Sequence, residues 1–544
     1  MLEIISLNNE HITIKVKKNK KEILNALGII YINNTNEFKI FNTPFALEVL
    51  LKYTNNNDKL KQKYEHSLIS WKKIQQEKNL NDYPGNPKLR HYQRVDVAIL
   101  KANKRFGLFN EMRTGKTPTI LTALSEMKTN KILFVVPKST ILLTWVPEIK
   151  KWTTYNCITI KDDITKVRTE KYNQFKNSNN CILVVSKNTF KNDIKNKLLT
   201  KFDFTLVIDE AHFLRNYKTA QSSTILEVAN KVSSVYCLTG TPANNHPSDI
   251  FGILKIIDNK LYKNIDYWDF VARYFGIIRK RITNFVTINI PKPNVKPQLA
   301  AEFDYLVKKI SIMRKQIDVR NEMPKIIKND LILTMPKAQT AIYYDTLETM
   351  KQELFYNKKS KITFLQIFTK LRTICSTPIN EGMKELGAKF NWLLDYLHDN
   401  ENDSIIIYSS FSDKGINILS NILDKYKLNH QLITGKVNHE QRLKAISDFQ
   451  SKKVKIILCN IKSTNVGITL DQGDVMIFLD RELNPTENEQ AESRFFPTQL
   501  NDNKTREIIN LYCANTIDLK IRDILNNKID INKVINDQGI KFFE

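Results

Sequence analysis

FNEMRTGKTPTI, residues 109–120, is the stretch that assigns this chain to a fold class. RFGLFN, residues 105–110, overlaps the start of this stretch and is a mainly apolar run typical of a strand. PTILTALSEM, which follows Thr117, has the composition of a helix. Residues 113–117 therefore lie where a strand turns into a helix. Backbone N–H groups at such a turn point toward the amino end of the helix and bind phosphate oxygens. Arg113 stands where loops of this kind often have another glycine, and its side chain needs only to point outward.

The residue types in this loop are those of a nucleotide site. Lys116 is at the position from which a lysine reaches the β and γ phosphates, and the Thr117 hydroxyl is at the position that holds Mg²⁺. The sequence therefore predicts that Thr114, Gly115, Lys116 and Thr117 bind ATP, with Lys116 also acting in catalysis. Gly-Lys-Thr alone is a weak signal, and the strand and helix around it strengthen the prediction.

Short apolar runs, separated by helical or polar stretches, occur in two series along the chain. The first series lies between about residues 89 and 242 and contains KILFVVP, CILVVS, FTLVIDE and SVYCLTGTP. The second begins near residue 386 and contains SIIIYSSF, NHQLITG, KIILCN, VMIFLD and EIINLYC. Apolar strands that alternate with helices indicate parallel sheets covered on both faces. We expect an α/β fold with two parallel-sheet lobes in tandem, a helical insert and a small α+β N-terminal domain.

Composition shifts suggest where these parts begin and end. Residues 1–82 form the expected N-terminal accessory domain, followed by a linker, NDYPGNPKL, rich in proline and glycine. We expect the first lobe over 87–335 with a basic helical insert at about 245–335, the second lobe over 336–520, and a helical tail over 521–544.

A pair of carboxylates follows one of the apolar runs. LVIDEAH places Asp209 and Glu210 at the carboxyl end of a strand, which is where ligands bind in open parallel sheets. Asp209 can hold Mg²⁺ through water, and Glu210 can polarise the water that attacks the γ phosphate. Standing alone, such a pair would more simply cap a helix.

With these motifs in order along residues 87–520, the chain resembles the Swi/Snf branch of superfamily-two helicase-like ATPases, whose two lobes are RecA-like. LRHYQ is similar to the family's adenine-reading element, so the resemblance implies that Arg90 and Gln93 contact the base. LTGTP, residues 238–242, matches the element that couples hydrolysis to lobe motion. IMRKQIDVRNEMPKIIKNDLILTMPKAQTAIY resembles the segment that joins the lobes in this branch.

The second lobe carries stretches similar to the family's remaining motifs, and some of them depart from the family pattern. QAESRFFPTQ implies that Gln490 and Arg494 are catalytic, with Arg494 as the arginine that faces the transferred phosphoryl group. Pro497 stands where relatives place a second arginine, and Arg506 is a neighbour that could substitute. In STNVGITL, Thr464 and Asn465 stand where relatives favour glycines.

The resemblance also implies a duplex DNA track across both lobes. The implied contacts to the DNA backbone are Lys138, Ser186, Lys187, Ser410 and Thr464. Phosphate contacts of this kind are indifferent to sequence and depend strongly on salt. A formal charge of +26 agrees with a polyanionic partner, although a Lys-, Asn- and Ile-rich chain is also what AT-rich coding produces. In the family, such motors are expected to translocate as monomers.

The favoured function is an ATP-driven duplex-DNA translocase that remodels branched or forked DNA by fork regression, branch migration or strand annealing. Residues 1–82 faintly resemble the recognition module of annealing and fork-remodelling translocases, against the alternative of a generic structural domain. Two other functions remain open: a motor that displaces proteins such as RNA polymerase, and a DNA-binding scaffold with a decayed ATPase. The compact plan suggests a phage or mobile element. Because no run of about 18 apolar residues and no signal peptide is evident, we expect a cytoplasmic protein without membrane contact.

Overall fold

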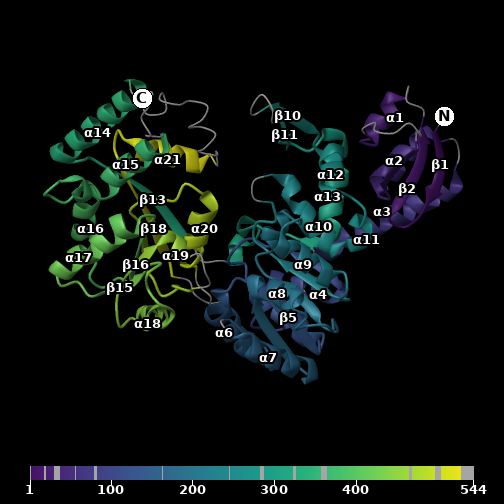
Figure 1. Ribbon diagram of the computed structural model, residues 1–544, viewed down its shortest axis with the longest axis horizontal. Coiled ribbons are helices and arrows are strands. Elements are labelled where there is room, and N and C mark those ends of the chain that lie inside the picture. Colours follow the sequence, from purple (N-terminus) through teal and green to yellow (C-terminus); the bar gives the residue numbers. More distant parts are fainter. Residues whose placement is uncertain are drawn as a thin grey trace. The chain divides into compact units, whose positions relative to one another are not determined.

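The protein is described by a computed structural model, shown in Figure 1. The described residues are 2–16, 20–29, 37–54, 57–78, 83–161, 163–243, 246–281, 287–322, 326–356, 364–464, 468–496 and 504–527. The chain divides into two compact units, Met1–Val319 and Arg320–Glu544, which we call unit 1 and unit 2. Within the described part of the chain, no helix is both long and apolar enough to cross a membrane.

Unit 1 is built on a seven-stranded parallel sheet. The strands lie in the order β12-β4-β9-β8-β5-β7-β6, and each neighbouring pair is parallel. The strand bounds are β4 Arg105–Leu108, β5 Lys131–Val136, β6 Asn156–Ile160, β7 Cys181–Ser186, β8 Thr205–Ile208, β9 Val235–Leu238 and β12 Ser311–Ile312. All the apolar runs predicted as strands of the first lobe lie in this sheet.

Helices cover both faces of this sheet because its strands are apolar on both sides. In β5, Leu133 and Val135 pack into one core, and Ile132, Phe134 and Val136 pack into another on the opposite face. The first core also contains residues of α7 Thr165–Asn177, α8 Lys187–Lys195, α9 Ala220–Ala229 and α10 Phe251–Ile257. The second contains residues of α4 His91–Ala102, α5 Lys116–Glu126 and α6 Val146–Trp152. The unit is therefore a three-layer α/β/α arrangement, as the sequence predicts.

The N-terminal residues form a small α+β domain with its own core. An antiparallel sheet of β1 Leu2–Leu7, β2 His11–Val16 and β3 Glu37–Phe41 packs against α1 Lys21–Ala26 and α2 Pro44–Tyr53. α3 Asp58–Lys78 follows. Phe41 of β3 and Trp71 of α3 pack instead into the large core of unit 1, where the Trp71 ring lies 5.0 Å from the ring of Tyr305. The domain is therefore docked within unit 1.

A buried ion pair reinforces this docking. Arg273 Nη2 lies 2.7 Å from Glu302 Oε1, and Arg273 Nη1 donates to the carbonyl oxygen of Leu27 at 2.6 Å. Glu302 also accepts hydrogen bonds from Tyr274 at 2.6 Å and from Thr43 at 3.3 Å. Leu27 and Thr43 belong to the N-terminal domain, so one buried carboxylate holds groups from both sides of the contact.

The insert after β9 is mainly helical, as expected, and it also contains a β-hairpin. Its helices are α10, α11 Asn259–Tyr262, α12 Tyr267–Tyr274 and α13 Ala300–Lys309. The hairpin consists of β10 Ile277–Arg281 and β11 Thr287–Pro291. After β12 the chain enters unit 2, where β13 Ile326–Leu333 already belongs to the second sheet. The second sheet therefore begins some residues before the boundary expected at 335.

Unit 2 contains a six-stranded parallel sheet in the order β13-β18-β17-β14-β16-β15. The further strand bounds are β14 Ile405–Ser409, β15 His430–Ile433, β16 Ile456–Asn460, β17 Val475–Phe478 and β18 Arg506–Cys513. The helices are α14 Lys337–Tyr356, α15 Phe364–Ser376, α16 Ala388–Asp399, α17 Asn417–Lys425, α18 His439–Gln450, α19 Ile461–Thr464, α20 Pro485–Ser493 and α21 Ile517–Asn526. The two tandem parallel sheets confirm the predicted fold class. Most of the expected tail, residues 528–544, lies outside the described residues.

Candidate functional site

The predicted phosphate-binding loop connects β4 to the first turn of α5. Arg113 and Gly115 adopt left-handed backbone conformations, with φ of 61° and 78°. A Cβ atom on Gly115 would lie 2.0 Å from Nε2 of Gln93, so the Gln93 side chain would have to shift, and the left-handed backbone itself favours glycine. Lys116 and the partly exposed Thr117 open α5, at whose amino end backbone N–H groups favour an anion. The geometry fits a phosphate group.

Lys116 folds back over this loop. Its ammonium donates to the carbonyl oxygens of Asn110 at 2.8 Å and Glu111 at 3.1 Å. A Cβ atom on Gly240 of the LTGTP element would lie 3.6 Å from Nζ of Lys116. Two motifs separated by more than a hundred residues are thus brought together at the carboxyl ends of β4 and β9.

The two residues expected to read adenine lie at the start of α4, against the same loop. Nε2 of Gln93 and the hydroxyl of Tyr92 both donate to the carbonyl oxygen of Thr114 at 2.9 Å. Oε1 of Gln93 accepts from the backbone N–H of Arg90 at 2.8 Å. In this structure Gln93 is buried and holds the loop, while Arg90 is partly exposed beside it.

Motif reasoning missed a second group that holds the loop. Arg314, which follows β12, donates to Oδ1 of Asp96 at 2.7 Å, and the side-chain amide of Asn110 donates to Oδ2 of Asp96 at 2.6 Å. Glu111 N–H donates to the carbonyl oxygen of Arg314 at 2.9 Å, which extends the ladder of β4 and β12. Burial raises the pKa of Asp96 to about 6 despite the neighbouring Arg314. The available signal was an acid between Val95 and Val97, in a helix whose other buried residues are mostly apolar.

Asp209 lies directly after β8, at the carboxyl edge of the sheet. Its Oδ2 accepts from Nε1 of Trp145 at 3.1 Å, and its Oδ1 accepts from the backbone N–H of Glu210 at 2.9 Å. Burial, followed by the charge of Glu210, raises the pKa of Asp209 to about 7, and the charge of Lys116 opposes this shift. A carboxylate poised in this way is a suitable partner for a divalent cation.

Glu210 is connected to the LTGTP element through His212. Glu210 has a left-handed backbone, with φ of 50°, and its Oε2 lies 3.2 Å from Nδ1 of His212. The same ring nitrogen lies 3.4 Å from the hydroxyl oxygen of the fully buried Thr239. The carboxylate expected to activate water is therefore linked to the neighbouring motif by side-chain contacts.

Three of the predicted DNA contacts line one basic pocket in unit 1. Lys138, Ser186 and Lys187 lie just after or at the ends of β5 and β7, around a cavity of about 490 Å³. Ser186 caps α8, accepting from the backbone N–H of Thr189 at 3.2 Å. Lys161 and Arg168 add to the positive charge of the pocket. This arrangement suits phosphate oxygens, which take hydrogen bonds from helix amino ends and from lysine and arginine.

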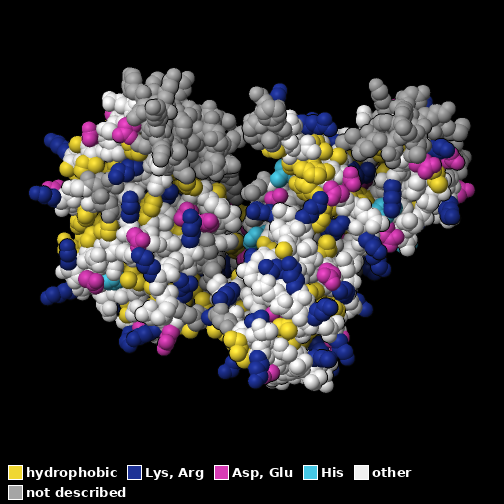
Figure 2. All heavy atoms as spheres, in the orientation of Figure 1, with side chains coloured by type: hydrophobic (Ala, Val, Ile, Leu, Met, Phe, Trp, Pro, Cys, Tyr) yellow, Lys and Arg dark blue, Asp and Glu magenta, His cyan; other side chains and the backbone are white. Residues whose placement is uncertain are grey.

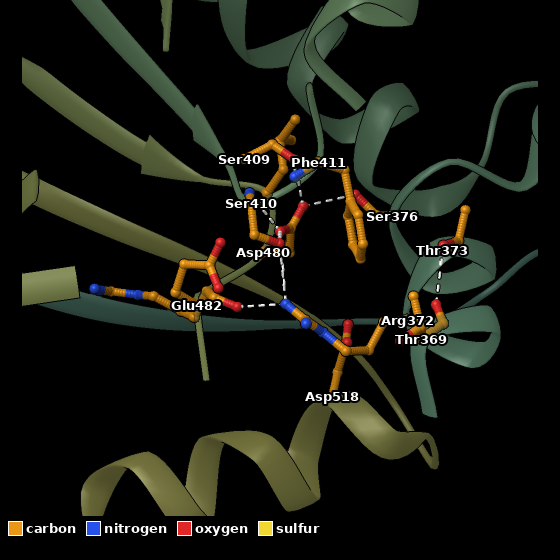
Figure 3. Close-up of polar contacts among 12 residues, drawn as sticks. Thr369, Arg372, Thr373, Ser376, Ser409, Ser410, Phe411, Asp480, Glu482 and Asp518 are labelled. Carbon is orange, nitrogen blue, oxygen red and sulfur yellow. Dashed lines mark hydrogen bonds and ion pairs between the residues drawn. The ribbon is translucent and has the colours of Figure 1, made fainter. Parts of the chain in front are cut away.

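In unit 2, the predicted contact Ser410 belongs to a buried polar cluster around Asp480 (Figure 3). Asp480 accepts from the side chains of Ser409 at 2.7 Å and Ser376 at 2.9 Å and from the backbone N–H of Ser410 at 2.7 Å. Nη2 of Arg372 donates to the Ser410 hydroxyl at 3.0 Å and to the carbonyl oxygen of Arg481 at 2.5 Å. The cluster fixes the loop after β14 and leaves Ser410 partly exposed.

Thr464 and Arg494 contact each other. Nε of Arg494 donates to the carbonyl oxygen of Thr464 at 3.1 Å, and the Thr464 hydroxyl donates to the carbonyl oxygen of Ile461 at 2.9 Å. Because the Thr464 side chain is fully buried, it does not present its hydroxyl at the surface. Gln490 is partly exposed on α20, one helical turn before Arg494.

The departures from the family pattern are only partly visible. Pro497 and Asn465 lie outside the described residues. Arg506 opens β18, is 3% exposed, and donates through Nη2 to the carbonyl oxygen of Asp471 at 2.7 Å. In this structure Arg506 therefore supports a loop within unit 2. Figure 2 shows Lys and Arg side chains spread over the visible face of both units.

Two family models match the chain. Residues 43–380 match the SNF2-related domain, and residues 388–496 match the helicase conserved C-terminal domain. The first match alone covers more than half of the chain and includes the phosphate loop and the Asp209–Glu210 pair.

Several proteins are similar to the chain at low identity. An uncharacterized ATP-dependent helicase of Mycoplasma genitalium is 26% identical over 522 residues, which cover 92% of this chain and 47% of that protein. One of Mycoplasma pneumoniae is 28% identical over 84% of this chain and 43% of its own length. The chain thus spans about half the length of these relatives. A solved structure of the Sulfolobus solfataricus SWI2/SNF2 ATPase core in complex with dsDNA is 21% identical, covering 85% of this chain and 95% of that chain, with a TM-score of 0.39.

Proposed function

Since the chain belongs to the SNF2-related family, we propose that it is a DNA-dependent ATPase that uses ATP and Mg²⁺ to move along double-stranded DNA. The observation that carries this proposal is the convergence of Lys116, Gly240 and the Asp209–Glu210 pair at the carboxyl edge of one parallel sheet. The relatives' names point in the same direction, since two of them are called ATP-dependent helicases.

Each of these residues has a role that follows from its position. The N–H groups of the loop and Lys116 would hold the triphosphate, and Thr117 and Asp209 would hold Mg²⁺. ATP supplies the phosphoryl group whose transfer to water releases the free energy for movement. Glu210 would orient the attacking water. Gln490 and Arg494 of unit 2 would be the other catalytic residues, with Arg494 facing the transferred phosphoryl group. His212 and Thr239 connect Glu210 to the LTGTP element, so a change at the phosphate can reach that element.

The pocket around Lys138, Ser186 and Lys187 is the proposed first contact with the DNA backbone. Of its lining residues, four are basic and one, Asp163, is acidic, and Asp163 lies 2.7 Å from Lys171. A positively charged site of this kind reads phosphates rather than bases. We therefore expect binding that is indifferent to sequence and that weakens steeply with salt.

We further propose that the preferred substrate is branched or forked DNA, with the N-terminal domain as the recognition element. The buried contacts of Arg273 and Glu302 fix this domain to the helices of the insert in unit 1. A domain held in this way would place a second DNA contact at a constant distance from the motor. Its outer sheet face presents Lys15, which lies between Glu3 and Glu37 of the neighbouring strands, and Lys39, which lies opposite Thr13.

The test measures ATP turnover by the full chain with no DNA, single strands, blunt duplex and a fork, with Lys116→Ala as the control. Removing the N-terminal domain would take away Phe41 and Trp71 and expose the part of the unit 1 core that they cover, including Tyr262 and Tyr305. We therefore prefer the surface variants Lys15→Glu and Lys39→Glu. A fork preference that these variants abolish, with turnover on blunt duplex unchanged, supports remodelling of branched DNA.

The other outcomes identify the alternatives. Equal stimulation by blunt duplex and fork would favour a motor that displaces proteins from DNA. DNA binding without turnover on any DNA would leave a scaffold whose ATPase has decayed. Turnover that Lys116→Ala does not reduce would contradict the assignment of the phosphate loop.

A further inference from the structure

The hairpin of β10 and β11, which we call the basic ribbon, is a strongly basic element of unit 1. Residues 276–296 contain five lysines and arginines and no aspartate or glutamate. In Figure 1 the ribbon stands beyond α12 and α13. The side chains of Arg279, Lys280 and Arg281 are all exposed. None of the motifs described above includes it.

The strand register divides the side chains of the ribbon between two faces. Arg279 lies opposite Asn289, and Arg281 lies opposite Thr287, so these four residues share one face. On the other face, Ile278 lies opposite Ile290, and Lys280 lies opposite Ile288. The isoleucines stabilise the pairing of the strands across the ribbon. Beyond Ile277 and Pro291 at the base, the first face carries only side chains that can donate hydrogen bonds.

The base of the ribbon is anchored, which a two-stranded hairpin needs because it is marginally stable alone. Lys292 N–H donates to the carbonyl oxygen of Gly276 at 3.0 Å, and the Lys296 ammonium donates to that of Ala272 in α12 at 2.8 Å. Nε2 of His246 lies 2.7 Å from the carbonyl oxygen of Lys292. His246 follows the LTGTP element by four residues, so the ribbon is tied to the loop that leaves the nucleotide site.

We propose that the basic ribbon is an additional DNA contact, with Arg279 and Arg281, which lie two residues apart on one face of β10, binding phosphates of the DNA backbone. The major groove of duplex DNA is wide enough to admit a two-stranded ribbon. Arginine binds phosphate through two parallel N–H groups, and Asn289 and Thr287 are neutral donors of the kind that contact the DNA backbone. This proposal rests on the proposed function in one respect, namely that the partner is DNA.

The test compares duplex binding by the full chain and by the double variant Arg279→Gln, Arg281→Gln over a range of salt concentrations. Removal of one phosphate-binding side chain lowers the salt slope by about 1, so we expect a slope smaller by about 2 and weaker binding at every salt concentration. The matched control is Lys104→Gln, Lys201→Gln. These exposed lysines precede β4 and β8, at the amino edge of the seven-stranded sheet, whereas the nucleotide site lies at its carboxyl edge. Replacing them should leave the salt slope almost unchanged.

Two further variants keep the test decisive. Thr287→Glu with Asn289→Glu retains both arginines but places negative charge on the same face, and it should weaken duplex binding as strongly. Lys280→Gln, on the isoleucine face, should lower the slope much less than the double arginine variant. ATP turnover without DNA should stay at the wild-type rate in all of them.

The outcomes separate this inference from the proposed function. If the wild-type chain binds duplex and the double arginine variant keeps its slope, the ribbon is not a DNA contact, and the proposed motor stands. If Lys280→Gln has the larger effect, the assignment of faces is wrong. If the wild-type chain itself shows no salt-dependent affinity for duplex, the proposed function fails first.

Discussion

Glu302→Ala should weaken the docking of the N-terminal domain on the rest of unit 1. Glu302 is 3% exposed, and its carboxylate is the common acceptor for Arg273, Tyr274 and Thr43. With the carboxylate gone, the buried guanidinium of Arg273 keeps the Leu27 carbonyl oxygen as a partner but has no negative charge beside it. The variant therefore leaves an uncompensated charge in the contact between the domain and the helices of the insert.

Removing one partner of a buried ion pair costs about 3–5 kcal/mol. Since each 1.4 kcal/mol is a factor of about ten in an equilibrium constant, protection of the docked state should fall by about 10² to 4 × 10³. Replacing both charges, as in Arg273→Met with Glu302→Met, should cost less than Glu302→Ala, because no buried charge remains.

The assay is amide hydrogen exchange of the full chain, followed in α2 and α13, which pack against each other. Asp304→Asn is the matched control on the same helix. Asp304 is 51% exposed and lies 2.8 Å from Lys308, an exposed pair worth about 0.5 kcal/mol at most. Its replacement should hardly change exchange.

Exchange in Glu302→Ala that differs from wild type by less than about tenfold would refute the reasoning. So would a double methionine variant that exchanges faster than Glu302→Ala. If the reasoning holds, Glu302→Ala should also lose any preference for forked DNA while keeping its turnover on blunt duplex.

Three other variants test the nucleotide site. Arg494→Ala should lower ATP turnover at least about tenfold with DNA affinity nearly unchanged, because this arginine acts on the transferred phosphoryl group; steady-state turnover near the wild-type rate would contradict its role. Asp209→Asn should raise the melting temperature by several degrees at pH 8 and by almost nothing near pH 4. The native pKa of about 7 lies above the ordinary value of 3.8 for an aspartate. Ionisation of Asp209 therefore destabilises the fold increasingly as pH rises between these two values, and the full effect is present above the native pKa. Calorimetry that shows the same rise in melting temperature at both pH values would contradict this explanation. Gly115→Ala should weaken binding of a fluorescent ATP analogue about tenfold or more, because its Cβ would lie 2.0 Å from Nε2 of Gln93 at a φ of 78°; unchanged affinity would mean that the loop has another conformation when it binds.

Most of the sheet architecture was predictable because buried parallel strands are apolar on both faces. β5, β7 and β14 each contain a run of five or six buried residues, which is typical of strands that are covered on both faces. The family matches confirm the resemblance drawn from the ordered motifs. β12 was missed because a strand of two residues has no periodicity to detect.

The contacts that hold the nucleotide loop were less predictable. Asp96 and Arg314 are separated by 218 positions, and nothing in either local sequence indicates its partner. The same is true of Arg273 and the Leu27 carbonyl oxygen, which are 246 positions apart. Pairs of this kind depend on how distant elements pack, and a single sequence does not contain that information.

The motifs predicted which residue types lie at the site, but they did not predict which of the side chains point toward the surface. Lys138 is exposed beside the basic pocket, as a phosphate contact requires. Thr464 matches a motif equally well, but its side chain is buried and its hydroxyl donates within α19. The roles assigned to Gln490 and Arg494 remain predictions, since they concern a nucleotide bound to unit 1.

Displacement of a third strand from a DNA triplex would show movement along duplex without requiring strand separation. The wild-type chain with ATP and Mg²⁺ should release the third strand at a rate that rises with ATP concentration, and Lys116→Ala should release none above the spontaneous rate. Rapid ATP turnover on the same DNA with no release of the third strand would contradict the proposed motor.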